Sequence, residues 1–256
     1  GQQCLAQEKC CILRQNSLKR HFILKAKISN REIWSIALPI MLGNMAQTII
    51  NFTDTAFLGH VGVIALGASM LAGLFYLLFT TVAAGFAIGI QIIVARRFGE
   101  KNFSRIGVIF EHGSLFVLLL GSILFSVLYF FSDRLLLLLI DSPNLYDASV
   151  EYIKYRQFGI LFVCFNYLYR ALYVGISNTK VITYSTLIMA AVNILLDYCL
   201  IFGNLGFPQM GISGAALASL SAELSAFIFF TAYSYITLRK REFGMFRAHR
   251  LESELM

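Results

Sequence analysis

Asn193 and Asp197 lie four residues apart inside the almost wholly apolar run AAVNILLDYCLIFG, residues 190–203. In a helix this spacing places both side chains on one face, one above the other. An amide can donate to a carboxylate while it accepts from another donor. A carboxylate in a medium of low dielectric also holds its proton more readily than one in water. The pair therefore predicts a site for a proton or a dehydrated cation, and the alternative is a packing network with a neighbouring helix.

A second acid, Asp54, ends a stripe of polar residues in the run PIMLGNMAQTIINFTDTAFLGH. The members of the stripe recur at spacings of three or four: Asn44, Gln47, Thr48, Asn51 and Asp54. A polar stripe on a membrane helix is expected to face other helices or a water-filled cavity. Asp54 is therefore a functional candidate, and the alternative is an acid at the level of the membrane interface.

Four further positions are candidates. Gln47 and Asn51 from the stripe, with Glu223 in GAALASLSAELSAF, are predicted to line a substrate cavity. Pro39 lies fifteen residues before Asp54, near the start of the same span. A proline lacks the N–H of a regular helix and clashes with the preceding turn, so a bend is predicted there.

The composition explains why these charges matter. The chain has 256 residues, of which 58% are apolar and only 14% are charged, and its mean hydropathy is +0.71. Soluble domains are closer to about 45–50% apolar and about 25% charged. A charge at the centre of a bilayer costs roughly 2.5–3.5 kcal/mol on insertion scales, so ionisable residues there are functional candidates by default.

Long apolar runs predict an all-α membrane protein, a bundle of six transmembrane helices. The predicted spans are residues 33–58, 63–95, 106–131, 151–175, 180–203 and 211–238. A short apolar segment, Arg134–Ile140, is predicted to form a separate interfacial helix on the outer side. Small residues in GISGAALASLSA and GFAIG predict close approach between helices.

The distribution of basic residues predicts the orientation. The tail of residues 1–31 carries seven Lys or Arg, the loop ARRFGEKNFSR carries four, the turn after the fourth span has Lys180, and the tail of residues 239–256 carries five. The loops that alternate with these segments are neutral or slightly acidic. Cytoplasmic segments carry the Lys/Arg excess. We therefore predict a multi-pass protein of the cell (inner) membrane with both termini cytoplasmic, and the net charge of +7 needs no nucleic-acid partner. No cysteine pair has zinc-ligand spacing supported by histidines, so no structural metal is predicted.

Several local patterns together resemble the multidrug and toxic compound extrusion (MATE) family of transporters. ALPIMLGNMAQTIINFTDTAFLGHVG is similar to the first span of that family, and AAGFAIGIQIIVARRFGEKN to the end of its second span. RALYVGISNTK resembles the exit of the fourth span, and NILLDYCLIFG with MGISGAALAS resembles the fifth and sixth spans. The matches follow the family order over residues 32–240.

The resemblance implies a secondary active transporter, not an enzyme, that exports organic cationic or amphiphilic compounds in exchange for H⁺ or Na⁺. It implies no cofactor beyond this coupling ion, and its partners would be a small organic substrate and the lipid bilayer. It also implies roles by position: Asp54, Asn193 and Asp197 in the cation site, Ser219 as the hydroxyl residue of the sixth span, and Pro39 as the bend.

Full members of the family have about twelve spans in two lobes. Six predicted spans therefore correspond to one lobe, and we expect either a missing C-terminal lobe or a second copy of the chain as partner. Three alternatives differ in function: a flippase for lipid-linked saccharides from the same superfamily, a non-transporting membrane scaffold, and an intramembrane aspartyl protease. The flippase is disfavoured because Arg170 is the one basic residue expected within the membrane. The protease is disfavoured because its Tyr-Asp and Gly-x-Gly-Asp patterns are missing around Asp54 and Asp197.

Overall fold

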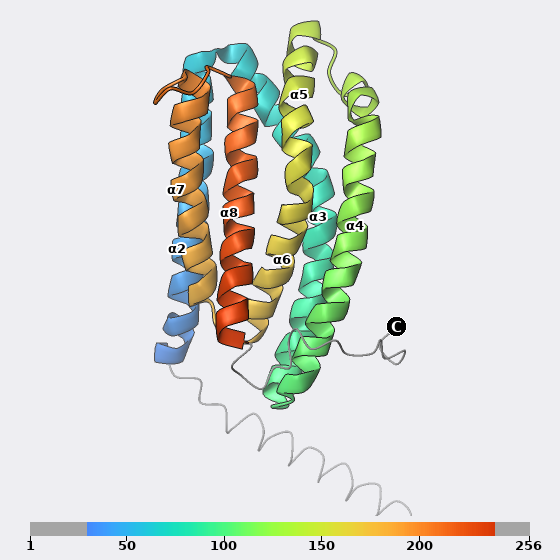
Figure 1. Ribbon diagram of the computed structural model, residues 1–256, viewed down its shortest axis with the longest axis vertical. Helices are drawn as coiled ribbons and strands as arrows, with labels where there is room; N and C mark the ends of the chain where they lie inside the picture. The colour runs from blue at the N-terminus through green and yellow to red at the C-terminus, as the bar shows by residue number, and fades with distance from the viewer. Residues whose placement is uncertain (1–29, 239–256) are drawn as a thin grey trace, which may run out of the picture. The chain divides into compact units, whose positions relative to one another are not determined.

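The computed structural model describes residues 30–238. The predicted tail of residues 239–256 lies outside this range, and so does the tail of residues 1–31 except for its last two residues. The described chain consists of helices, whose bounds are α2 (Asn30–Val61), α3 (Val63–Gly99), α4 (Phe103–Leu137), α5 (Pro143–Arg156), η1 (Gln157–Gly159), α6 (Ile160–Gly175), α7 (Lys180–Phe202) and α8 (Ile212–Leu238). The segments α5, η1 and α6 follow one another without a gap and make one span (Figure 1). The prediction of an all-α bundle with six long helical units is confirmed.

Five of these units are long and apolar enough to cross a membrane: α3, α4, the α5–α6 unit, α7 and α8. Helix α2, which carries the polar stripe and Pro39, is not among the five found in the described range. It is nevertheless continuous from Asn30 to Val61, so the proline does not divide it. The bend at Pro39 stays a prediction.

The predicted interfacial helix at Arg134–Ile140 is wrong as a separate element. Helix α4 continues to Leu137, because leucine is a good helix former and the segment contains neither glycine nor proline. The fourth span then begins earlier than predicted, at Pro143. Proline is favoured at a first helical position, where its missing N–H and fixed φ cost nothing.

Buried side chains join α3, α4, α6 and α8 into one core. Leu128, Ile160, Leu168 and Leu172 have no more than 1% of their surface exposed. Between α6 and α8, Tyr169 and Tyr173 both stack on Phe230, at centroid distances of 5.5 and 5.8 Å. The two tyrosine hydroxyls are paired with hydroxyls of α8, Thr231 at 3.1 Å and Ser234 at 2.7 Å. The halves of α6 and α8 that hold these residues are therefore firmly packed together.

Small residues allow close approach at some of the predicted positions. A Cβ atom on Gly214 of α8 would lie 2.7 Å from the backbone carbonyl of Leu200 on α7, so the prediction for GISGAALASLSA holds there. For GFAIG in α3 it is wrong: Gly85 and Gly89 have no neighbouring atom within 4 Å of such a position. They lie on the outward face of α3, whereas Val94 of α3 packs closely against Gly175 of α6.

Candidate cation-coupling site

Helices α2 and α7 pack in parallel, and this packing places the two predicted aspartates at one level. The hydroxyl of Thr183 donates to the carbonyl of Pro39 over 2.6 Å, at a separation of 144 residues. Further along, the rings of Phe57 and Phe202 meet at 5.4 Å. The offset between contacting residues is nearly constant from one end to the other. Helices α2 and α7 run in the same direction (Figure 1). At this constant offset Asp54 lies level with Asp197.

The carboxyl groups of Asp54 and Asp197 lie close enough to interact directly. Asp197 is completely buried. Neither of its oxygens, nor Asp54 Oδ1, receives a hydrogen bond from a donor in the described structure. Ionised carboxylates are acceptors only. Their contact is therefore favourable only when a proton or a cation lies between them.

Asn193 lies one turn before Asp197 on α7 and is 1% exposed. Its amide nitrogen and its amide oxygen both lack a hydrogen-bond partner. Buried polar groups are usually paired. An unpaired amide on the same helix face as an unpaired carboxyl therefore indicates a binding position for a proton or a cation. Oxygen ligands suit hard cations. If Na⁺ binds here, oxygens of Asp54, Asn193 and Asp197 fit as its ligands, although no cluster of three His, Cys, Asp or Glu occurs within residues 30–238.

Ser219, implied only by the family resemblance, lies half-buried on α8. Helix α8 runs antiparallel to α7, and Gly214 packs on Leu200. From this contact, five residues forward along α8 lead to Ser219, and five residues back along α7 lead to Leu195, at the same height. Ser219 is thus at the height of the cation-site residues of α7, between Asn193 and Asp197.

The three predicted cavity residues have different surroundings. Gln47 is half-buried and donates to exposed Asn51 over 3.3 Å, so these two stay together on α2. Glu223 is buried and forms a bidentate ion pair with Arg156, with one bond of 2.7 Å between Arg156 Nη1 and Glu223 Oε2. Arg156 was not predicted to lie within the membrane, where Arg170 was the one basic residue expected. The signal that identifies it is Glu223 itself, since an acid in mid-span needs a cation from a neighbouring helix.

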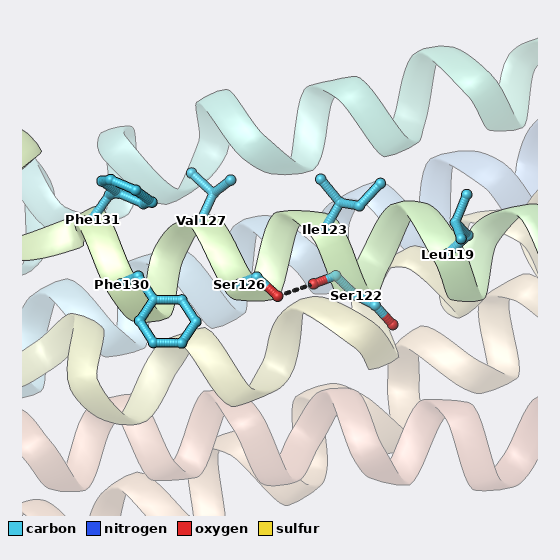
Figure 2. Close-up of a pocket in the computed structure, with 7 residues that line it drawn as sticks. All are labelled: Leu119, Ser122, Ile123, Ser126, Val127, Phe130 and Phe131. Atoms are coloured by element: carbon cyan, nitrogen blue, oxygen red, sulfur yellow. Dashed lines mark hydrogen bonds between the residues drawn. The ribbon is translucent and has the colours of Figure 1, made fainter.

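Surface hollows do not coincide with these polar groups. The hollow in Figure 2, about 310 Å³, lies along the outer face of α4 between Leu119 and Phe131. Its two serines are already bonded within the helix, as Ser126 donates to the carbonyl of Ser122 over 2.8 Å (Figure 2). The remaining lining is apolar, as expected for a surface that meets lipid chains.

Comparison with known proteins decides the family. Residues 39–199 match the family model described as MatE, and that range contains both aspartates and Asn193. The chain belongs to the MatE family. Members of this family are ion-coupled transporters, not enzymes.

Two curated relatives and one solved structure illustrate the match. The chain is 28% identical over 211 residues to a probable multidrug resistance protein NorM of Agrobacterium fabrum, covering 82% of this chain and 45% of the relative. It is 31% identical over 189 residues to a probable NorM of Rhizobium meliloti, covering 74% and 40%. A MOP superfamily transporter from Pyrococcus furiosus has the same fold, with a TM-score of 0.79 at 23% identity, covering 88% of this chain and 49% of that one. The chain thus spans about half the length of these relatives.

Proposed function

We propose that this chain is the ion-coupled lobe of an efflux transporter that exports organic cationic or amphiphilic compounds in exchange for H⁺ or Na⁺. The observation that carries the proposal is the meeting of Asp54 and Asp197 across α2 and α7, with buried oxygens that lack donors. The curated relatives that it matches are named as probable multidrug resistance proteins. A shared proton, or a Na⁺ that Asn193 also contacts, would satisfy these oxygens.

Coupling requires that the ion bind one conformation of the lobe more tightly than another. With the site filled, the carboxyl groups attract the same ion and α2 stays against α7. With the site empty, two negative charges repel each other in a medium of low dielectric. Repulsion at Asp54 would then separate that part of α2 from α7, while the bond between Thr183 and Pro39 keeps the other part attached. The predicted bend at Pro39 would absorb the movement.

A second lobe or a second copy of the chain completes the proposal. Helix α2 has an exposed polar stripe, made of Asn44, Thr48, Asn51 and Thr55. The hydroxyls of Thr48 and Thr55 donate to carbonyls of their own helix, but lipid chains offer no hydrogen bonds to the amide nitrogens of Asn44 and Asn51. We infer that this face lines a substrate cavity shared with the partner, and that both termini lie in the cytoplasm.

The test is efflux by the intact transporter that contains this chain, with Asp54→Asn and Asp197→Asn compared with wild type. Each variant is expected to lose at least about tenfold in ion-driven efflux, because an amide cannot carry the proton and binds Na⁺ less strongly. Asp147→Asn is the matched control, since Asp147 is an exposed acid of α5 and the same substitution there is expected to leave efflux unchanged. Wild-type efflux in both site variants would refute the proposal.

The coupling ion is separated in the same assay. Efflux driven by a pH gradient without Na⁺, lost on dissipating that gradient, identifies H⁺. Efflux that needs a Na⁺ gradient at constant pH identifies Na⁺. Activity that depends on neither gradient would contradict the antiport mechanism.

A further inference from the structure

The fourth span is interrupted in its interior. Helix α5 ends at Arg156, η1 occupies Gln157–Gly159, and α6 begins at Ile160. A stretch of 3₁₀ helix inside a longer helix often marks a hinge. The side-chain nitrogen of Gln157 donates to the carbonyl of Lys154 over 3.0 Å, while its oxygen is buried without a partner. The backbone stays hydrogen-bonded through the interruption, from the N–H of Gln157 to the carbonyl of Ile153 and from the N–H of Ile160 to the carbonyl of Gln157, so the group that lacks a partner is the side-chain oxygen of Gln157.

The upstream half of the span is attached to α8 by Arg156. Its guanidinium makes the bidentate pair with Glu223 and lies 4.3 Å from the centre of the Tyr76 ring on α3. The Arg156 and Glu223 side chains are only 13% and 11% exposed. A cation stacked on an aromatic face and bound by both carboxylate oxygens is held in one geometry.

The downstream half is attached to the same residue. The amide nitrogen of Asn166 on α6 donates to the backbone carbonyl of Glu223 over 3.0 Å. Glu223 thus binds α5 through its side chain and α6 through its backbone. Gly159, inside the interruption, leaves room for the ion pair: a Cβ atom there would lie 2.7 Å from Arg156 Nη1 and nearer still to Glu223 Oε2.

We propose that Glu223 and Arg156 form a clamp that fixes the two halves of a hinged fourth span against α8, positioning α5 and α6 relative to each other during transport. A buried ion pair adds little net stability compared with apolar packing, yet removal of one partner leaves an uncompensated charge. The contribution of the pair between Arg156 and Glu223 is therefore the geometry in which it holds the helices. The titratable groups that interact with the pair are Tyr76 of α3, Tyr152 of α5 itself and Cys164 of α6, with Asp54 of α2 interacting with Arg156 at longer range. The role in transport rests on the proposed function, whereas the clamp itself does not.

Amide hydrogen exchange tests the clamp directly, on the 256-residue chain in lipid nanodiscs with no ion gradient. Glu223→Gln and Arg156→Gln are each expected to raise exchange of the amides of residues 157–163 at least tenfold. Amides of residues 186–196 in α7 are expected to exchange as in wild type. Restoring the pair in reverse, with Arg156→Glu and Glu223→Arg together, is expected to recover a large part of the protection.

Glu151→Gln is the matched control. Glu151 also joins α5 to α8, by accepting from the hydroxyl of Ser213, but it lies more than one turn from the interruption. Its replacement is expected to leave the exchange of residues 157–163 unchanged. Unchanged exchange in Glu223→Gln overturns the proposal. An equal effect of Glu151→Gln, an equal rise in α7, or a reversed pair as loose as the single variants overturns it as well. This experiment measures no transport. The clamp can therefore be refuted while the efflux test of Asp54 and Asp197 supports the proposed function, and the proposed function can be refuted while the clamp is supported.

Discussion

Asp197 and Ser234 are equally buried but differ in their hydrogen bonding. The carboxyl of Asp197 is fully buried and both oxygens lack donors. A buried polar group without partners costs about 1–3 kcal/mol. Ser234 is equally buried, yet its hydroxyl is paired with that of Tyr173 at 2.7 Å. The two positions should therefore respond to substitution in opposite directions.

We expect Asp197→Asn to raise the free energy of unfolding of the chain by about 1–3 kcal/mol without Na⁺ at a pH high enough to ionise both Asp54 and Asp197. The amide supplies a permanent donor to Asp54 and removes one of two facing negative charges. Ser234→Ala is expected to lower it by about 1 kcal/mol, because the Tyr173 hydroxyl loses its partner. Both effects are measured by chemical unfolding in detergent. A lower free energy of unfolding for Asp197→Asn would contradict the interpretation that these carboxyl oxygens form an ion-binding site.

At the scale of residues, the sequence was informative where burial of a charge is expensive. Asp54, Asn193 and Asp197 were identified because a bare acid in an apolar run demands an explanation, and the structure brings the two aspartates together. Arg156 was missed because it lies close to the acidic loop, and a count of charges cannot tell where a helix starts. Its depth became clear only when the fourth span was found to begin at Pro143.

At the scale of elements, two helices end in the same way. After α3, Lys101 has φ of 57°, and its N–H and that of Asn102 bond back to the carbonyls of Phe98 and Arg97. After α6, Ser177 has φ of 58°, and the N–H groups of Ser177 and Asn178 bond to Val174 and Tyr173. Both are Schellman motifs, in which glycine is the favoured residue at the left-handed position. Next to the first, Arg97 and Arg96 hold the pKa of the exposed Glu100 carboxyl below its usual range.

Replacing Lys101 or Ser177 with glycine is therefore expected to stabilise the chain by about 0.5–1 kcal/mol each, since the left-handed conformation costs other residues about 1–2 kcal/mol and glycine loses part of that gain in the unfolded chain. Gly203→Ala is the opposite case. Gly203 ends α7 with φ of 74°, and a Cβ atom would lie 2.9 Å from the backbone nitrogen of Gln209. Thermal unfolding midpoints in detergent should rise for the first two variants and fall for the third. A fall in all three would show that the turns tolerate no change.

The elements themselves were largely predictable because long apolar runs permit only helices in a membrane. Their ends were less predictable. Nothing in DRLLLLLIDSP marks the point at which α4 stops, since the leucines are equally compatible with a continued helix and a separate one. The interruption at Gln157–Gly159 also has no sequence signal beyond one glycine, because tertiary contacts to Glu223 hold it.

At the scale of the whole molecule, α2 presents two exposed stripes of opposite character. The exposed polar stripe, defined above, contains Asn51. The exposed apolar stripe consists of Met45, Ile49 and Phe52, which are 61%, 53% and 74% exposed. Neighbouring stripes on one helix cannot both suit lipid. The chain covers 45% of the Agrobacterium fabrum relative, and the polar stripe is the face for which we propose a cavity shared with a partner.

Cysteine labelling distinguishes the two stripes, in a chain whose native cysteines are replaced by serine. Asn51→Cys is expected to react at least about tenfold faster than Phe52→Cys with a charged, water-soluble methanethiosulfonate, because the reactive thiolate forms only where water reaches. The two positions are one residue apart, so they share the same depth in the membrane and differ only in the direction they face. The reaction is followed by mass spectrometry of intact membranes. Equal rates would mean that both stripes meet the same medium, and the inferred cavity along α2 would have to be abandoned.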